Sequence, residues 1–412
     1  MTNTFITAKN LGLIGRDAAY EFKNNQTFLA TATHTYDHMY DKNNYYNPGD
    51  TVQVRLPNNY IPQEGDTVTV QDIKERTVPL VLEPLLSLPL AYTTTDLTTS
   101  TGGGASESWK QRVLFPAVRS LTSLLNLKIA IKAKTQTNLY TGDETANINA
   151  YSVVDNAGAV LDENACSRSL RRYCALATRQ SAALRQSATL QNSFVQSINK
   201  DITLNSQLGR LADFDMFSEQ SIAYQDTTTD ARTGVSVKTS VASGATSIVM
   251  TGFTVSTVGI VKAGDVFSFT GIKGVNPITK GSTGQDFQLV ATADADSDSG
   301  GDATISVYPA PIFGATEPNA NINTQIIATT PVVFVGDHHV NMAWSEDGLI
   351  VVCPPLTPLD TPFCTTIKDP DTGYSLRLSK SAEILDNKNV MRIDILYGIR
   401  WLNERAVRIL SL

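Results

Sequence analysis

Between residues 234 and 330 the sequence changes from mixed segments to short stretches in which apolar and polar residues alternate. These stretches are VSVKTSV, TSIVMTG, GDVFSFTGI, DFQLVATA and ATISVYPAP, and Gly, Asp and Ser separate them. A period of two is typical of strands that bury one face. About six strands in roughly one hundred residues predict a small barrel or sandwich. Because mixed sequence flanks the block, we interpret it as an insertion whose two ends lie close together.

Length and composition limit the possible functions. A chain of 412 residues predicts two or three domains. Hydrophobic residues make up 42% of the chain, which is enough to form cores. Charged residues make up only 18%, which is expected if other protein covers much of the surface. The net charge of −7 disfavours a dedicated DNA-binding protein, because no overall positive field attracts phosphate. The four cysteines have no zinc or CxxC spacing, which predicts reduced, mostly buried thiols.

Targeting signals are not visible in the sequence. The N-terminus lacks the basic and apolar regions of a signal peptide, and no long apolar run predicts a membrane span. We therefore expect folding in a reducing cytoplasm and no contact with a membrane.

The first ninety or so residues predict extended structure. Residues 1–47 are polar, with one short helical stretch near Leu13 to Phe22, and predict a segment that is either disordered or held against something else. We interpret it as an arm that lies on a neighbouring molecule. Residues 48–82 predict a long two-stranded hairpin, which needs a partner surface to be stable. The run VPLVLEPLLSLPL at 78–90 is interrupted by three prolines, which favours an edge or irregular strand lying across a helix.

A long amphipathic helix is predicted from Leu114 to near Tyr140. A capping box formed by Ser106 or Ser108 with Gln111 marks its start, and Pro116 either kinks it or occupies its first turn. One face is apolar at steps of three and four: Leu114, Val118, Leu121, Leu125 and Ile129.

The region 143–233 predicts a strand at 148–155 and a helix from Asp162 to about Gln196. Its arginines could contact phosphate, but a solvated face or a contact with an acidic neighbour is favoured. These are Arg168, Arg171, Arg172, Arg179 and Arg185. After the insertion, the segment PVVFVGDHHVNMAWSEDGLIVVCPP and a pair from Met391 to Leu412 predict further strands.

Motifs for chemistry are weak. The segment ADADSDSGGD resembles the start of a calcium loop, but its glycine is one place late and Ile305 replaces the required Glu, so a solvated turn is favoured. Its acidic residues are Asp294, Asp296, Asp298 and Asp302. GxSxG is missing, and Gly102 to Gly104 lack the GK[ST] of a phosphate loop. We therefore predict no catalytic, cofactor-binding or metal-binding residues and no cofactor.

The histidines also give no clear site. His34 and His38 have helical spacing beside Asp37 and Asp41, but surface positions on the arm are favoured over a metal site. His338 and His339 would point to opposite faces of a strand and would not share a site.

The order of elements resembles that of tailed-phage major capsid proteins, in the coat-protein family with an inserted β-barrel. The strongest local similarities are VKAGDVFSFTGIKGVNPITKGSTGQDFQLVATA in the block, and Tyr397–Gly398 followed by Glu404–Arg405–Ala406–Val407. The resemblance implies an α+β fold of the tailed-phage capsid type carrying an inserted all-β barrel. The implied domains are an N-terminal arm (1–47), an extended loop (48–82), a peripheral domain (83–142 and 374–412), an axial domain (143–233 and 331–373) and the barrel (234–330).

The same resemblance implies a function in self-assembly. Hexamers and pentamers would form an icosahedral shell, as procapsid and mature head, around packaged double-stranded DNA that is contacted only weakly. Scaffolding and portal proteins are implied partners, a decoration protein is left open, and the virion is the expected location after assembly in the host cytoplasm. In relatives a long acidic loop leaves the early barrel strands, whereas Val241 to Gly264 is too short for one.

Two groups of residues are candidates for these contacts. Asp17 and Glu21, four residues apart on the arm helix, resemble the acidic positions that engage a scaffolding protein, with a hydrated helix face as the alternative. The inter-subunit loop candidates are Arg55, Tyr60, Glu64 and Asp66.

Two other function classes remain open. An adhesin or tail structural protein with a β-rich binding domain predicts a secretion signal or trimeric repeats. A hydrolase using carboxylates such as Asp213 and Asp215 predicts perturbed titration in a cleft.

Overall fold

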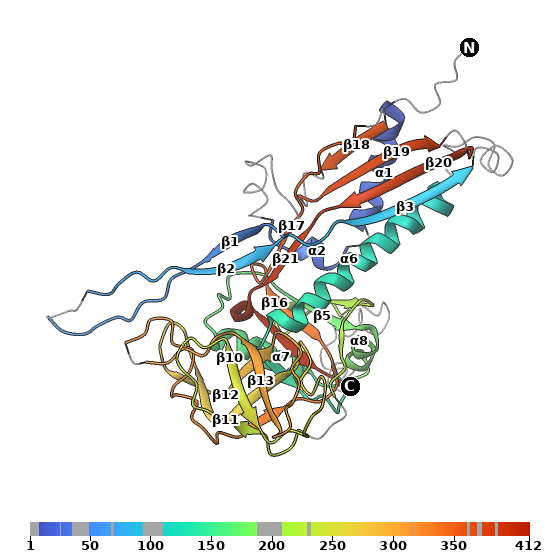
Figure 1. Ribbon diagram of the computed structural model, residues 1–412. Helices are drawn as coiled ribbons and strands as arrows, with labels where there is room; N and C mark the ends of the chain where they lie inside the picture. The colour runs from blue at the N-terminus through green and yellow to red at the C-terminus, as the bar shows by residue number, and fades with distance from the viewer. Residues whose placement is uncertain are drawn as a thin grey trace, which may run out of the picture. The chain divides into compact units, whose positions relative to one another are not determined.

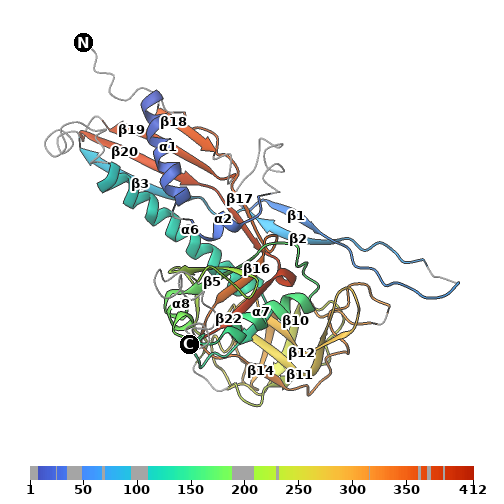
Figure 2. The same cartoon turned by 180° about the vertical axis from the view of Figure 1, so that it is seen from behind.

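The computed structural model describes residues 8–24, 26–34, 49–66, 70–93, 110–187, 208–228, 232–314, 316–360, 363–368, 373–383 and 386–412 (Figures 1 and 2). Two compact units are present. The first comprises Met1–Val54, Val78–Ile129 and Ile350–Arg400, and the second comprises Arg55–Thr77, Ala130–Leu349 and Trp401–Leu412. Helices and strands are mixed in both units, which confirms the predicted α+β class.

The first unit contains a four-stranded antiparallel sheet in the order β18-β19-β20-β3. Helix α1 (Ala8–Asn24) packs on it, with Phe22 against the ring of Tyr374 at 4.8 Å, so the short arm helix predicted near Leu13 is confirmed. The proline-interrupted run supplies β3 at the sheet edge, as predicted, because an edge strand tolerates proline. The elements are α2 (Phe28–Thr31), β3 (Leu86–Thr93), β18 (Phe363–Lys368), β19 (Ser375–Glu383) and β20 (Lys388–Ile395).

The predicted long helix is α6 (Phe115–Gln136), preceded by a π-helical turn, η1 (Lys110–Leu114). Its five predicted apolar positions are all buried, and Pro116 lies in its first turn. It ends before Tyr140, because β4 (Tyr140–Gly142) pairs in parallel with β22 (Ala406–Leu410). Ser106 and Ser108 lie outside the described residues.

The hydropathy of this helix has a structural explanation. By length and composition the segment Gln111–Gln136 could cross a membrane, and half of it is buried inside the protein. Its apolar residues are those of a core helix, such as Leu121 and Leu125, while Arg119 and Lys128 are exposed on another face.

The second unit contains a mixed six-stranded sheet in the order β4-β22-β16-β5-β7-β6. Helix α7 (Tyr151–Glu163) packs on it through Val154, Ala157 and Leu161, against Phe214 and Val407 of the sheet. The remaining elements are β5 (Arg172–Ala177), α8 (Thr178–Arg185), β6 (Arg210–Leu211), β7 (Phe214–Glu219) and β16 (Asn341–Ser345).

Two secondary-structure predictions in this region are wrong. The segment 148–155, predicted as a strand, begins helix α7, because its apolar residues continue at helical spacing through Ala157 and Leu161. The helix predicted from Asp162 to Gln196 is interrupted by β5, which lies between β16 and β7. Four consecutive residues of β5 (174–177) are buried, so the strand shows no alternation, and its Ala and Leu favoured a helix in the prediction.

The block from residue 234 forms a six-stranded, nearly closed barrel-like sheet in the order β14-β11-β12-β13-β10-β9 (Figure 1). Its ends lie side by side, as predicted, because Val237 N donates to Thr330 O at 3.0 Å and Ser236 pairs with Pro331. The last strand, β14, lies entirely beyond residue 330, so the sheet extends further than the predicted block. The strands are β9 (Ser236–Val237), β10 (Ser247–Thr251), β11 (Val266–Val275), β12 (Ser282–Ala291), β13 (Asp302–Tyr308) and β14 (Val332–Phe334).

Three short strand pairs complete the described fold. β15 (His338–His339) pairs with β8 (Tyr224–Gln225), and β17 (Leu349–Val352) with β21 (Gly398–Trp401), which leads into the 3-10 turn η2 (Asn403–Arg405). The predicted hairpin consists of β1 (Thr51–Leu56) and β2 (Arg76–Val81). Its strands are shorter than predicted, because Val70 and Ile73 lie in the connection, where no strand is present among the described residues.

Candidate assembly sites

The connection between β1 and β2, of which residues 57–66 and 70–75 are described, exposes several apolar side chains. We call it the extended loop. Tyr60, Val70 and Ile73 are 55%, 97% and 71% exposed, although residues of these types usually avoid water. Gln71 joins the two arms of the loop, since its amide group accepts from Ile61 N at 3.1 Å and donates to Ile61 O. The two arms of the loop, whose path Figure 1 shows, are therefore joined to each other, and the loop carries exposed apolar side chains.

The four predicted loop candidates are all at the surface. Arg55 lies at an exposed position of β1, and Tyr60, Glu64 and Asp66 are exposed on the first arm of the extended loop. Their contact with another subunit stays a prediction.

The two scaffold candidates on α1 differ from each other. Asp17 is partly exposed, whereas Glu21 is only 9% exposed and pairs with Arg119 at 2.6 Å. The alternative prediction that both residues lie on a hydrated helix face is therefore wrong for Glu21, because its carboxylate pairs with Arg119 of the same unit. Asp17 remains the accessible candidate, together with the exposed neighbouring residue Tyr20.

Helix α6 and η1 present a second surface. Val113 and Leu124 are 36% and 40% exposed. Arg112, which precedes Val113, and Lys128, four residues after Leu124, are also exposed. This surface, the outer face of α6, combines apolar groups with positive charge.

A buried polar junction lies between the insert and its host domain. The Asp265 carboxylate, fully buried, accepts from Arg232 Nη1 and Gln225 Nε2 at 2.6 Å each, and from Lys262 N at 3.0 Å. Gly264 adopts φ +97°, and a Cβ there would lie 2.7 Å from Gln225 Oε1, so glycine is required. The junction fixes the start of β11 in place.

Arg408 of β22 completes the junction. Its guanidinium is fully buried and donates to Gly264 O at 2.9 Å, to Thr137 Oγ1 at 3.0 Å and to the last carbonyls of α6, those of Ala133 and Lys134. A cation at a helix C-terminus is favourable, because it interacts with the negative end of the helix dipole. Burial lowers the pKa of Arg408 to about 9, partly opposed by Asp265, so its charge is retained at neutral pH.

His338 is a buried histidine in this region. It is fully buried, and its Nδ1 lies 2.8 Å from Gly336 O, so the neutral ring carries its proton on Nδ1. Burial, with the nearby cations Arg408 and Lys134, lowers the pKa of His338 to about 4, against the opposing effects of the Gly336 carbonyl and Asp337. His339 points the other way and packs on Tyr224 at 5.0 Å, which agrees with the predicted opposite faces.

We expect this histidine to make the protein sensitive to mild acid. Because its pKa is lower in the folded state than in the unfolded state, the unfolded chain binds the proton first, and stability falls as pH drops from about 6.5 to about 4. The loss is about 3 kcal/mol. Urea unfolding across this pH range should show a clearly smaller loss of stability in His338→Asn than in the wild type, while His339→Asn should retain most of the loss. Equal pH slopes in wild type and His338→Asn would refute this assignment.

The acidic turn resembling a calcium loop has a structural role. Asp294 Oδ1 accepts from Ala263 N at 2.8 Å, and Asp296 Oδ1 accepts from Gly259 N at 2.7 Å. Asp298 accepts from its own turn, and Asp302 pairs with Lys238. These carboxylates join neighbouring barrel loops, and no cluster of metal-ligating residues occurs in the described part of the chain.

Three of the five arginines for which a solvated face or an acidic neighbour was favoured contact carboxylates, whereas Arg179 is exposed and Arg185 contacts Ser181. Arg168 and Arg172 both bind Asp162, and Arg171 Nη2 lies 3.4 Å from Asp215. Asp213 pairs with Arg210 at 2.6 Å, so both carboxylates of the hydrolase alternative are in exposed ion pairs. His34 is described, and burial lowers its pKa, whereas Asp37, His38 and Asp41 lie outside the described residues.

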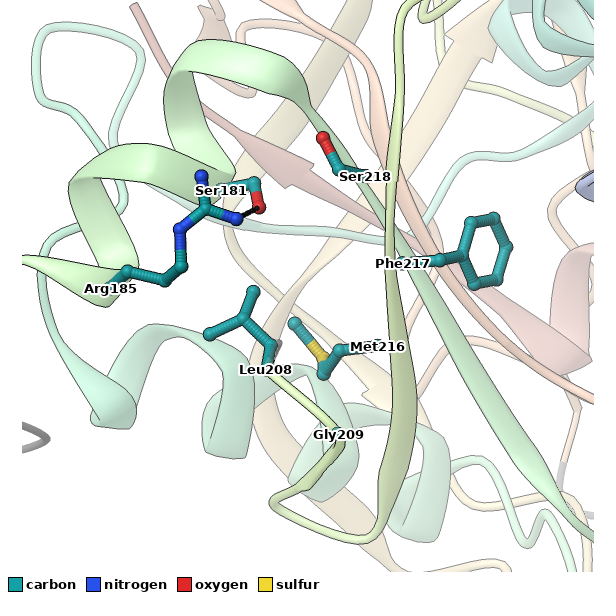
Figure 3. A pocket seen from close by; sticks show the side chains of 7 residues that line it. All are labelled: Ser181, Arg185, Leu208, Gly209, Met216, Phe217 and Ser218. Carbon is teal, nitrogen blue, oxygen red and sulfur yellow. Dashed lines mark hydrogen bonds between the residues drawn. The ribbon is translucent and has the colours of Figure 1, made fainter. Parts of the chain in front are cut away.

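A pocket of about 330 Å³ lies beside α8 and β7 (Figure 3). Its lining includes one charged side chain, Arg185, whose Nη1 donates to Ser181 Oγ at 3.2 Å. Phe217 points away from the other lining side chains in Figure 3 and packs on Trp344. These lining side chains offer no pair of titratable groups for acid–base chemistry. The lining residues are Ser181, Arg185, Leu208, Gly209, Met216, Phe217 and Ser218.

All four cysteines are free thiols. Three are buried and Cys364 is partly exposed, which confirms the prediction of mostly buried thiols.

The chain is similar to known phage proteins. The chain is 28% identical over 162 residues to the major capsid protein of Acyrthosiphon pisum secondary endosymbiont phage 1, a match that spans 36% of this chain and 37% of that relative. Among solved structures, that of Mycobacterium phage Che8 matches at a TM-score of 0.47 and 11% identity, covering 93% of this chain and 90% of the other. The capsid structure of Cyanophage P-SCSP1u matches at a TM-score of 0.43 and 12% identity, covering 89% and 84%.

The family comparison is the most extensive one from sequence. The model of the family described as "P22 coat protein - gene protein 5" matches residues 105–409. This range includes the insert, the buried junction and the C-terminal strands. Since the match covers well over half of the sequence, the chain belongs to the P22 coat protein family.

Proposed function

We propose that this chain is a major capsid protein that assembles into the icosahedral shell, procapsid and mature head, around packaged double-stranded DNA. Family membership supports the proposal, and the extended loop is the observation that carries it. A loop that is ordered by Gln71 and yet exposes Val70 and Ile73 gains stability when a neighbouring subunit covers it. The chain is thus suited to assembly with copies of itself.

The outer face of α6 is the surface that we propose the loop of a neighbour covers. Both surfaces carry apolar side chains, Val70 on the loop and Leu124 on the helix. Their charges are opposite, since Glu64 and Asp66 are exposed on the loop and Lys128 on the helix. Each such contact is weak, but a closed lattice makes many of them mutually reinforcing.

The remaining assignments extend this proposal. Hexamers and pentamers would be the capsomers, and scaffolding, portal and decoration proteins would be partners, with Asp17 the accessible scaffold candidate. The five predicted domains, from the arm (1–47) to the barrel (234–330), would divide these roles. Contact with DNA would be weak and non-specific at a net charge of −7, assembly would take place in the host cytoplasm, and the mature location would be the virion. Catalysis is not part of the proposed function.

Assembly of the purified chain tests the proposal. We expect shells or polyheads by negative-stain microscopy, and Glu64→Lys with Asp66→Lys should lower their yield about fivefold or more, because attraction at each contact becomes repulsion. Asp213→Lys with Asp226→Lys makes the same charge change at exposed positions outside the loop and should leave the yield unchanged. Fibres or trimers would favour an adhesin instead, and compact monomers with turnover would favour an enzyme.

A further inference from the structure

A series of ion pairs lies along the second arm of the extended loop, where the loop returns to β2. Lys74 Nζ lies 3.0 Å and 2.8 Å from the two carboxylate oxygens of Glu317, which belongs to the insert. Two residues further on, Arg76 pairs with Glu404. Residues two apart in extended chain face the same side, so Lys74 of the loop and Arg76 of β2 bind carboxylates on one side.

Glu317 is held in place by the insert. Its backbone N donates to Gly314 O at 3.2 Å, and its carbonyl accepts from Ala320 N at 3.1 Å, which makes a tight turn. The next carbonyl, that of Pro318, accepts from the ammonium group of Lys280. The insert thus presents a carboxylate at a defined position to the loop.

The insert itself is tied to its host domain near the same turn. Asn276 Nδ2 donates to Glu163 O, the last residue of α7, at 2.7 Å. Within the loop, Gln71 on the second arm is hydrogen-bonded to Ile61 on the first arm. A contact at Lys74 therefore restrains both arms of the loop relative to the insert.

We propose that Glu317 of the insert is a positioning residue, which holds the extended loop through Lys74 in the orientation that docks onto a neighbouring copy. The inference rests on the proposed function, because it assigns the insert a role within assembly. Binding by a loose loop must first overcome the entropy cost of ordering it, and a loop positioned beforehand avoids part of that cost. The Lys74 and Glu317 side chains are 52% and 26% exposed, so the pair is weak enough for the loop to readjust on docking.

Distance measurement on unassembled subunits tests this directly. Val70→Cys on the loop and Val258→Cys on the insert, 97% and 85% exposed, would carry spin labels in a Cys364→Ser background. We expect a narrow distance distribution in this labelled chain. Glu317→Gln or Lys74→Gln should lower the population of that distance about two- to fivefold, and the exchange Lys74→Glu with Glu317→Lys should restore it.

Controls separate positioning from general charge effects. Lys238→Gln removes a lysine from the exposed pair with Asp302 on the insert and should leave the distribution unchanged. Raising the salt concentration should broaden the distribution of the labelled chain and have no further effect in Glu317→Gln. An unchanged distribution in both single variants, or failure of the exchange to restore it, would overturn the proposal.

The measurement is independent of the proposed function. Because it uses soluble subunits, it reports on the loop even if the chain forms no shells. A positive result should be accompanied by slower shell formation in Glu317→Gln and recovery in the exchanged variant. If the label distances show a positioned loop but the chain never assembles, the contact stands and the capsid function is rejected. If Glu317→Gln forms shells at the full rate, only the positioning role is rejected.

Discussion

Replacing Asp265 by asparagine is expected to lower the free energy of unfolding by about 3–5 kcal/mol. The side chain keeps its shape, but the buried Arg232 and Arg408 lose the nearby negative charge while remaining out of water. Removing one partner of a buried ion pair is costly for this reason, even where the intact pair adds little. Urea unfolding at pH 7, followed by circular dichroism, measures the change.

Asp226→Asn is the matched control for this substitution. It makes the same chemical change on a 74% exposed side chain, which lies 3.2 Å from Lys262, and its effect should stay within about 0.5 kcal/mol. Similar losses in the two variants would show that the charge in the junction contributes no special stability. A larger loss in Asp265→Asn alone would support the junction as the attachment of the insert.

Replacing Trp344 by alanine is expected to cost about 3–5 kcal/mol as well, through a different mechanism. Trp344 is fully buried in β16, with its ring at 5.3 Å from that of Trp401 and at 5.6 Å from that of Phe217. Deleting the indole leaves a cavity between these rings and removes two edge-to-face contacts. Thermal or urea unfolding of the soluble subunit would show the loss.

Two further variants separate the effect of side-chain size at residue 344 from the effect of where an aromatic ring lies. Trp344→Phe keeps an aromatic ring at the site and should lose less than the alanine variant. Tyr224→Ala removes an aromatic ring that is 46% exposed and should cost less than either. If Trp344→Ala unfolded like the wild type, this aromatic cluster would not be part of the stabilising core.

Local sequence patterns predicted the helices and strands that bury one face and expose the other to solvent. In β13 burial alternates residue by residue, so the period of two was visible in the sequence. The apolar face of α6, from Leu114 to Ile129, was visible for the same reason at helical spacing. Where residues are buried on both sides, as in β5, the pattern disappears and the prediction was wrong.

The buried junction was missed because its members are far apart in the sequence. Gln225, Asp265 and Arg408 come from three distant segments that only the folded chain brings together. A partial signal existed, since Arg408 is the one charged residue in the apolar strand Ala406–Leu410. An arginine in such a strand is expected to have buried polar partners, but the sequence does not say which ones.

The sequence by itself determined that a β-rich block interrupts an α+β chain, that a long helix buries one face, and that few charges are available for nucleic acid. These follow from composition and from periodicity, which act over a few residues. Only the tertiary structure decided that Glu21 is internally paired, that the extended loop is linked to Glu317, and that the insert is anchored by buried charges. Ion pairs and buried networks depend on distances between remote segments, and those distances are fixed when the cores pack.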